Sequence, residues 1–203
     1  RTGLIAPAIV AICATILGTL IGLWAGFTGG ITDSVTMRSI DIVYAIPPLL
    51  VAVVLVGLLG GGYWLAVAVL IVLSAPADVR VVRAAVMAQR ELPYIAAART
   101  LGLSQTRIAL KHVLPNIAPT LAANALLQFV VALIALSGLA FLGIGVSAGT
   151  PDWGLMIAEN RGILDLNPLA VIAPALCITL LAVAVAILGD RIFDVATDRG
   201  ASR

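Results

Sequence analysis

The chain has 203 residues, of which 62% are hydrophobic and 11% charged, and its mean hydropathy is +1.15. Soluble proteins hold about 45–50% apolar and about 25% charged residues, so a soluble globular fold and a disordered chain are both excluded. The net charge of +2 is too small to indicate nucleic-acid binding. Long apolar segments without alternation are typical of membrane helices, so the sequence predicts an all-α integral membrane protein.

Five apolar segments approach the roughly 20 residues that a membrane span requires. We expect spans at about residues 4–27, 42–59, 63–82, 117–146 and 168–189. The fourth has no charge and is long enough for a tilted helix with a broken end around Gly143 and Gly145. The apolar cores of these spans are taken to contain no Asp, Glu, His, Lys or Arg. Cys13 and Cys177 lie inside apolar runs, where we expect neither a disulfide nor a metal site.

The basic residues predict how the spans are oriented. One set of connecting segments, 28–41, 78–112 and 190–203, carries ten Lys and Arg residues, whereas the other set carries Arg1 and Arg161. Because cytoplasmic loops are enriched in Lys and Arg, the first set is expected in the cytoplasm. The amino terminus is then outside and the carboxyl terminus inside. An external start without a signal peptide predicts one further span before Arg1.

Glycine recurs every four residues along the first span, at Gly18, Gly22 and Gly26. Such spacing places a smooth groove on one helix face and permits close helix contact. Packing within this chain and packing against another subunit both remain open.

The segment 83–116 is far longer than a connection between neighbouring helices requires. We expect a short helix that starts at Pro93 and ends at a left-handed cap at Gly102. Ser104 is expected to cap a second helix that runs to Val113 and stops before Pro115.

The faces of these two short helices differ in character. Ile95, Ala98 and Leu101 are expected along one side of the first helix, and Arg107 and Lys111 on one face of the second. From composition alone, a basic helix resting on anionic lipid remains an open interpretation.

Several motifs in this order resemble a known family. Residues 94–102 (YIAAARTLG) and 112–116 (HVLPN) resemble the EAA signature of permease subunits of binding-protein-dependent ABC importers. The detail is similar to the dipeptide, oligopeptide and nickel branch (DppC/OppC-like). Further similarity to that branch is found at Asp41 with Ile46-Pro47, at 141–146 (FLGIGV), at 151–154 (PDWG) and at 188–199, so it covers essentially the whole chain.

The resemblance implies a type I ABC importer permease fold, with six spans in the full subunit and a single transmembrane domain over 1–203. It implies a cytoplasmic coupling loop at 83–116, which contacts the ATPases through 91–116, and an external loop at 147–167. The cargo would be peptides or similar small solutes. The implied location is the cytoplasmic or inner membrane of a bacterium or archaeon.

The resemblance also implies the partners. These are a second homologous permease subunit, two ATP-binding cassette ATPase subunits, an external solute-binding protein and the lipid bilayer, with no nucleic acid. ATP and Mg²⁺ would bind to the partner ATPases, because this sequence has no GxxxxGK[ST] phosphate loop. The chain is therefore expected to be no enzyme and to bind no cofactor itself.

By the resemblance, the ATPase-coupling residues are Ala97, Ala98, Arg99, Gly102, His112, Leu114 and Pro115. Small side chains suit a helix that enters a cleft deeply. His112 is the only histidine, so we expect a structural or interface role for it. One departure stands out: the glutamate that names the motif aligns with Ala96, so an ion pair from that position is absent.

A polar stripe follows in the fourth span, formed by Asn116, Thr120, Asn124 and Gln128 at intervals of four residues. Thr120, Asn124 and Gln128 are candidates for the translocation pathway, although interhelical hydrogen bonding explains such residues equally well. Asn116 is expected to be a cap or anchor.

Trp153 and Gly154 are candidates for an external platform that receives the binding protein. Anchoring of the tryptophan at the membrane interface is the alternative.

Two other functions remain to be weighed. An ion-coupled secondary transporter or channel usually needs an ionisable residue inside the membrane, which the predicted cores lack. A simple membrane anchor with a basic loop would not need the polar stripe.

Overall fold

The computed structural model describes residues 2–147 and 149–201, and its regular structure there is entirely helical. Side chains of residues 195–201 lie outside the described part, and with them Asp198 and Arg199 of the carboxyl-terminal motif. The elements in chain order are α1 (Thr2–Thr28), α2 (Gly30–Tyr44), α3 (Pro48–Leu58), α4 (Tyr63–Arg90), α5 (Pro93–Thr100), α6 (Gln105–Ile108), the π-helical η1 (Ala109–Val113), α7 (Leu114–Phe141), α8 (Trp153–Asn160), the 3₁₀ turn η2 (Arg161–Ile163) and α9 (Leu169–Ala201).

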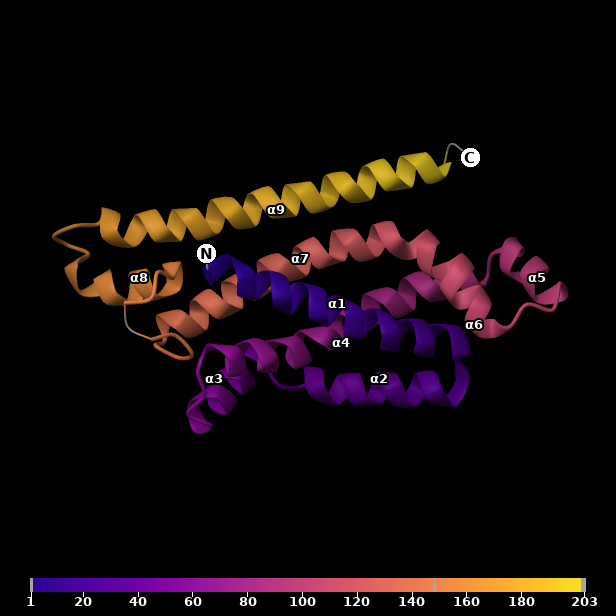
Figure 1. Cartoon of the computed structure of the whole chain (residues 1–203), viewed down its shortest axis with the longest axis horizontal. Helices are drawn as coiled ribbons and strands as arrows, with labels where there is room; N and C mark the ends of the chain where they lie inside the picture. Colours follow the sequence, from indigo (N-terminus) through magenta and orange to yellow (C-terminus); the bar gives the residue numbers. More distant parts are fainter. Residues whose placement is uncertain (1, 148, 202–203) are drawn as a thin grey trace.

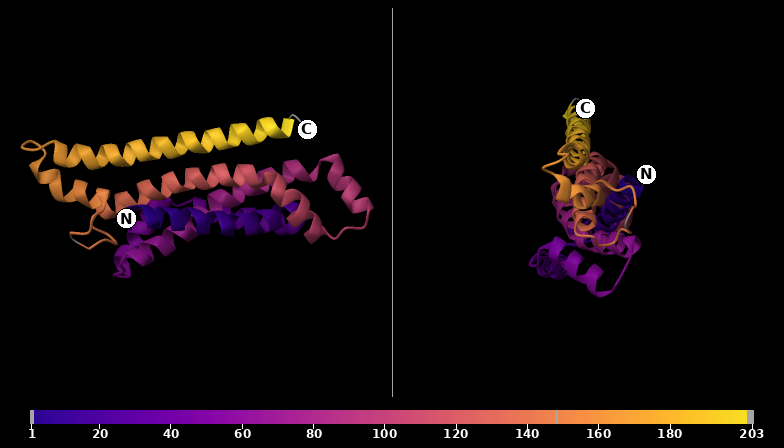
Figure 2. Two further views of the ribbon diagram at one scale, coloured as in Figure 1. Left: turned by 45° about the horizontal axis from the view of Figure 1, so that its top comes forward. Right: turned by 90° about the vertical axis from the view of Figure 1, so that its left-hand side faces the viewer.

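The long helices run side by side along the molecule (Figure 1). Helices α1, α4 and α7 form the centre, while α9 lies on one side of them and the α2–α3 pair on the other (Figure 2). The short helices α5 and α6 lie at one end, which we call the α5 end. Helix α8 lies at the opposite end, which we call the α8 end.

In the described residues, four helical stretches are long and apolar enough to cross a membrane. These are Gly3–Thr28, Tyr63–Arg90, Gln105–Phe141 and Leu169–Asp194, and the bent α2–α3 pair would make a fifth. The all-α prediction is confirmed, and the number of apolar stretches agrees with the expected five.

The second expected span differs from the observed helices. Residues 42–59 were expected as one helix, but the chain breaks between Tyr44 and Pro48, and α2 and α3 meet at 70°. Pro48 forces the residue before it out of the helical region, and Pro47 accordingly has ψ 121°. Helix α3 has 11 residues, about 16 Å at 1.5 Å per residue, so it cannot cross the bilayer alone.

Helix α2, expected as a loop, is fastened to α4 by ion pairs. The Arg83 guanidinium donates to both carboxylate oxygens of Asp33, and Arg80 donates to Asp41 at 2.7 Å. Arg80 also lies over the Tyr44 ring, 4.5 Å from its centroid. The polar stretch before α3 is therefore a helix held along the outside of α4.

The glycines of α1 pack directly on α4. A Cβ atom at Gly22 would lie 2.8 Å from the Val79 carbonyl oxygen, and one at Gly26 would lie 3.1 Å from that of Arg83. At Gly18 an added Cβ would collide with Asp78. The glycines of α1 therefore serve packing within this chain, which was one of the two uses that the sequence left open.

The buried apolar side chains form two separate clusters. The cluster nearer the α8 end joins α1, α3, α4 and α7 and contains Ala6, Val10, Ala52, Val56, Ala66, Val67, Leu70, Ala132, Leu136 and Leu139. The cluster nearer the α5 end contains Leu23, Phe27, Val82, Val86, Ile95, Ala98, Ile108, Ala109, Val113 and Ile117. Between the two clusters lie Thr15 and Gly18 on α1, Asp78 on α4, and Asn124 and Gln128 on α7.

Candidate functional site

The segment that links α4 to α7 is held by local backbone rules. Pro93 occupies the first turn of α5, and the helix ends where Gly102 adopts φ +75°. The Gly102 N–H donates to the Arg99 carbonyl at 2.9 Å and the Leu103 N–H to that of Ala98 at 3.2 Å, which is a Schellman motif. The Ser104 side chain then accepts from the Arg107 N–H and caps α6, as expected.

One side of α5 is anchored in the protein and the other is open. Ile95 is fully buried and Ala98 is 5% exposed, both in the apolar cluster at the α5 end. Ala97, Arg99 and Gly102 are exposed. Of the predicted coupling residues on α5, Ala98 therefore belongs to the anchor, whereas the other three are accessible to a partner.

Leu101 corrects one expectation, because it is 80% exposed rather than aligned with Ile95 and Ala98. The helix ends at Thr100, so the spacing that would return Leu101 to the buried side no longer applies. Leu101 therefore adds apolar surface to the open side of α5.

The second short helix does not stop before Pro115. Residues 105–141 form one continuous helical stretch that passes through the π-helical turn η1. Proline lacks an N–H and clashes with a regular preceding turn, and the wider π turn directly before it relieves that conflict. One turn of this stretch also has a side-chain bond, because the His112 carbonyl accepts from the Asn116 side chain at 2.8 Å.

Side-chain hydrogen bonds join the two long helices at this end. The Tyr94 hydroxyl donates to Gln89 on α4 at 2.7 Å and accepts from Asn116 on α7 at 3.2 Å. Asn116 is thus an anchor, as predicted. His112 and Leu114 are half-buried and Pro115 is exposed, so all three adjoin this network without forming a separate site.

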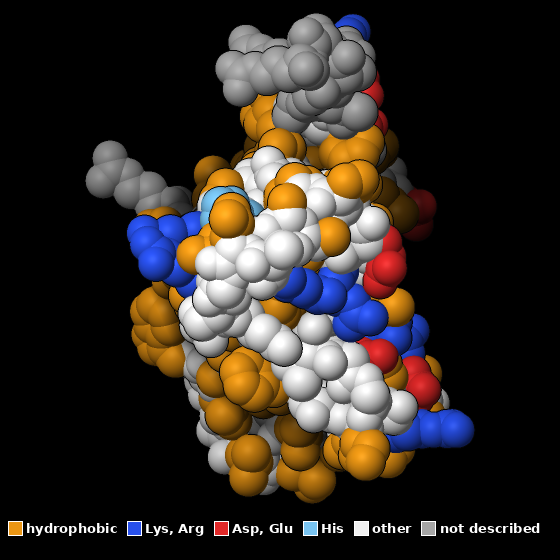
Figure 3. Space-filling view, turned by 90° about the vertical axis from the view of Figure 1, so that its right-hand side faces the viewer, with side chains coloured by type: hydrophobic (Ala, Val, Ile, Leu, Met, Phe, Trp, Pro, Cys, Tyr) orange, Lys and Arg blue, Asp and Glu red, His pale blue; other side chains and the backbone are white. Residues whose placement is uncertain are grey.

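The surface of the α5 end combines charge with apolar atoms. Basic side chains gather across the middle and at both margins of this face, with orange apolar atoms between them (Figure 3). Arg99 lies over the Phe27 ring at 5.8 Å, and Arg90 donates to the last carbonyls of α1, those of Gly26 and Phe27. Together with the Tyr94 hydrogen bonds to Gln89 and Asn116, these contacts attach α5 to α1, α4 and α7.

The structure separates the members of the polar stripe. The side chains of Asn124 and Gln128 both donate to Asp78 Oδ1 on α4, the latter at 2.8 Å. Thr120 and Asn124 also line a groove of about 560 Å³ between α4, α7 and α9. The groove is lined by Val81, Thr120, Ala123, Asn124, Leu127, Gly189, Asp190, Phe193 and Asp194.

Asp78 is the residue that the sequence analysis missed. It is 0% exposed and lies within α4, which runs on to Arg90 without a break. The expectation that no ionisable residue lies in a span is therefore wrong, and it no longer argues against an ion-coupled carrier. The signal was present: two amides on α7 need buried partners, and Asp78 sits among valines and alanines on the preceding span.

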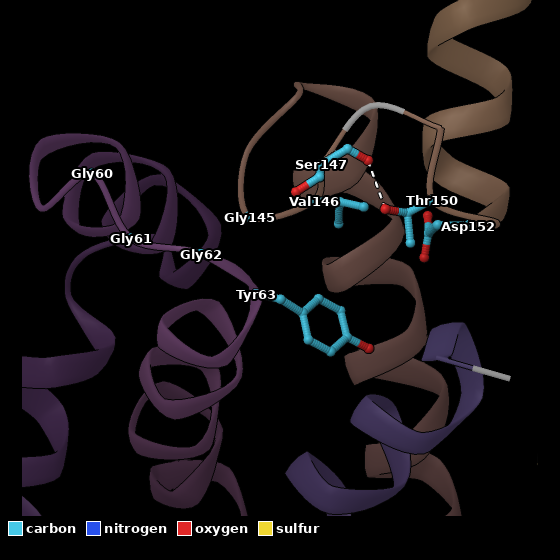
Figure 4. A pocket seen from close by; sticks show the side chains of 9 residues that line it. All are labelled: Gly60, Gly61, Gly62, Tyr63, Gly145, Val146, Ser147, Thr150 and Asp152. Carbon is cyan, nitrogen blue, oxygen red and sulfur yellow. Dashed lines mark hydrogen bonds between the residues drawn. The ribbon is translucent and has the colours of Figure 1, made fainter.

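The α8 end has a hollow of about 350 Å³ between the α3–α4 and α7–α8 connections. Figure 4 shows its glycine-rich walls and the Tyr63 side chain in the space below Ser147 and Thr150. The hollow is lined by Gly60, Gly61, Gly62, Tyr63, Gly145, Val146, Ser147, Thr150 and Asp152.

Asp152 and Gly154 fix the start of α8. The Asp152 carboxylate accepts from the Gly154 and Leu155 N–H groups at 2.9 and 3.2 Å and caps the helix. Gly154 is buried, and a Cβ there would lie 2.8 Å from Ser137 Cα on α7. Gly154 therefore packs α8 on α7, whereas half-buried Trp153 lines a second, shallow hollow nearby. Their role in a platform stays a prediction.

Comparison with known proteins gives the family. The family described as "Binding-protein-dependent transport system inner membrane component" matches residues 18–199. The chain belongs to this family. The family consists of inner-membrane transport components, and the apolar helices of the described residues agree with a multi-pass membrane location.

Individual relatives show which permeases the chain is similar to. The chain is 39% identical over 158 residues to the di/tripeptide transport system permease protein DppC of Pseudomonas aeruginosa, covering 78% of this chain and 52% of that protein. It is 35% identical over 171 residues to a probable peptide ABC transporter permease of Sinorhizobium fredii, with 84% and 59% covered. The glutathione transport system permease protein GsiD of Escherichia coli is 32% identical over 162 residues, with 80% and 54% covered. The chain spans about half the length of these relatives.

A solved structure matches the fold. A chain from inward facing conformations of the MetNI methionine ABC transporter superposes with a TM-score of 0.69 at 22% identity, covering 96% of this chain and 94% of that one. The expected type I importer permease fold is therefore confirmed.

Proposed function

We propose that the chain is one of two transmembrane subunits of an ATP-driven importer and carries half of the pathway for peptides or similar small solutes. The named transport roles of the DppC and Sinorhizobium relatives support the cargo class. The partners would be a second homologous permease subunit, two ATPase subunits that bind and hydrolyse ATP with Mg²⁺, and an external solute-binding protein.

One observation carries the proposal: α5 is open on one side and anchored on the other. Ala97, Arg99 and Gly102 face outward, while Ile95 and Ala98 join the apolar cluster shared with α1, α4 and α7. A partner that holds the exposed side would move the anchored side, and through it three membrane helices. We place the α5 end in the cytoplasm, in line with the distribution of basic residues.

The test is Gly102→Trp in the assembled transporter. Nothing lies within 4 Å of an added Cβ at Gly102, so the bulk projects away from the protein. Because φ is +75° there, some local strain accompanies the change. We expect the chain to insert and assemble, with solute uptake and solute-stimulated ATP hydrolysis both abolished in proteoliposomes.

The control is Leu166→Trp, which introduces the same side chain at a residue that is 87% exposed and lies beyond α8. It is expected to leave uptake and ATP hydrolysis unchanged. Unchanged uptake in the Gly102→Trp transporter would end the coupling role of α5.

A further inference from the structure

A polar layer divides the interior of the helix bundle. We use this name for Asp78 on α4, Asn124 and Gln128 on α7, and the Ser74 carbonyl on α4. On α4, the layer separates Leu70 in one apolar cluster from Val82 in the other. On α7, Gln128 and Asn124 likewise lie between the two clusters, so the layer occupies the middle of the bundle.

The contacts within the polar layer all run between α4 and α7. Asp78 Oδ1 accepts from the side-chain amides of both Asn124 and Gln128. The Gln128 amide also donates to the Ser74 carbonyl at 3.3 Å. Two successive turns of α7 are therefore bonded to one turn of α4.

The polar layer is closed on its remaining side by α1. Asp78 is 0% exposed, and Gly18 lies directly against its Cβ. The Thr15 hydroxyl adjoins the same carboxyl group. Within the described part of the chain, Asp78 makes no ion pair.

Burial of a carboxyl group without a cation is costly in a membrane, so such a residue is a functional-site candidate by default. Hydrophobic burial does not drive helices together in lipid, so the position of one helix along another depends on close packing and on side-chain hydrogen bonds. Side-chain hydrogen bonds are directional and do fix that position. Asp78 is thus the described residue best placed to set the register of α4 on α7.

Helices α4 and α7 are also the two helices that flank the coupling segment. Helix α4 ends at Arg90, just before α5, and the stretch that becomes α7 begins at Gln105, just after it. A displacement of α5 acts on both helices at the α5 end. That displacement reaches the α8 end as one motion only if α4 and α7 are also joined beyond the apolar cluster at the α5 end.

We propose that Asp78 is a positioning residue that makes α4 and α7 move as one unit, so that a displacement at α5 passes through the middle of the membrane. This inference rests on the proposed function and adds the element that carries the motion. Without the bonds from Asn124 and Gln128, ATP hydrolysis continues, but each ATP hydrolysed gives less import.

The experiment compares Asp78→Leu with Asp78→Asn in the complete transporter in proteoliposomes, and the readout is solute imported per ATP hydrolysed. Leucine removes the acceptor, whereas asparagine keeps an oxygen for both amides. We expect ATP hydrolysis close to that of the parent for both variants. Import per ATP falls roughly fivefold or more for Asp78→Leu and stays near the parent value for Asp78→Asn.

A second readout does not depend on transport. Spin labels at Val81 on α4 and Leu127 on α7, both lining the groove beside the polar layer, report the separation of the helices. The free cysteines Cys13 and Cys177 are first replaced by alanine. The distance distribution is expected to broaden with Asp78→Leu and to stay narrow with Asp78→Asn.

One control variant and one replacement variant keep the outcomes distinct. Asp165→Leu removes an exposed acid after α8 and is expected to change neither readout. If Asp78→Leu does not assemble, Gln128→Met removes one of the two amides at similar size, with its bonds to Asp78 and to the Ser74 carbonyl. It is expected to lower import per ATP by a smaller factor.

Unchanged import per ATP and an unchanged label distribution in the variants that lack the bond would overturn the inference. So would an Asp78→Asn transporter as uncoupled as Asp78→Leu, because the negative charge rather than the hydrogen bonds would then be required. If the parent complex imports nothing with ATP, the proposed function fails, whereas the label distances still test the link between α4 and α7.

Discussion

Helix α4 packs against its two central neighbours by different physical means. Against α1 the contact is steric, because a Cβ added at Gly18 or Gly22 would clash with α4 and one added at Gly26 would be tight. Against α7 the middle of the contact is polar, with both amides of the layer bonded to Asp78. The first contact tolerates no change of shape, whereas the second depends on a few directional bonds that a single substitution removes.

This difference predicts that the two contacts respond differently to substitution. The α1–α4 pair is expected to behave as a rigid unit in every state of the protein, since close van der Waals packing is lost all at once. The α4–α7 contact is expected to hold only while its hydrogen bonds hold. Variants of the two contacts should therefore fail in different ways.

The largest expected effect is that of Gly22→Leu. Its side chain would overlap the Val79 carbonyl and Val82, so α1 must move away from α4. Overpacking typically costs about 1–3 kcal/mol, and a leucine set against backbone atoms belongs at the upper end of that range. We expect a large loss of monodisperse protein in detergent size-exclusion chromatography.

The matched control for this change is Gly138→Leu on α7, where an added Cβ has nothing within 4 Å. It is expected to give a yield close to that of the parent. Equal yields for the Gly22 and Gly138 variants would contradict the steric account of the α1–α4 contact.

An intermediate effect is expected for the polar contact. A double-mutant cycle with Asp78→Ala and Gln128→Ala, followed by unfolding in mixed micelles, should give a coupling free energy of about 1 kcal/mol. The same cycle between Asp78 and Ile134, an exposed residue of α7, should give none. A coupling of zero in the first cycle would mean that the polar layer does not hold α4 to α7.

The smallest effect is expected at the outer face of α4. Arg80 and Asp41 form an ion pair whose side chains are 44% and 55% exposed. Exposed pairs contribute about 0–1 kcal/mol, so Asp41→Asn should leave the midpoint of thermal unfolding almost unchanged. A clear drop in that midpoint would show that α2 contributes more to stability than its exposed contacts suggest.

The sequence predicts the helices that hydropathy alone determines. Four of the long stretches lie close to the expected spans, and the α5 cap at Gly102 follows directly from local backbone preferences. Motif order indicated the family before any geometry was known. The open side of α5 also lies where the resemblance placed the coupling residues, apart from buried Ala98.

What the sequence did not predict depends on three-dimensional context. Pro48 breaks the second apolar segment whereas Pro115 does not end its helix, because a π turn before Pro115 absorbs the conflict. Hydropathy averaged over a window hides a single Asp78 among apolar neighbours. Only the positions of the facing helices show that two amides on α7 supply its partners.

The most direct test of the account is site-specific photo-cross-linking at the two ends of the assembled transporter. A benzoylphenylalanine at exposed Ala97 is predicted to cross-link to a subunit whose sequence carries the GxxxxGK[ST] loop, identified by mass spectrometry. The same group at Met156, exposed on α8, is predicted to capture no such subunit. An ATPase captured from Met156 and not from Ala97 would contradict the account.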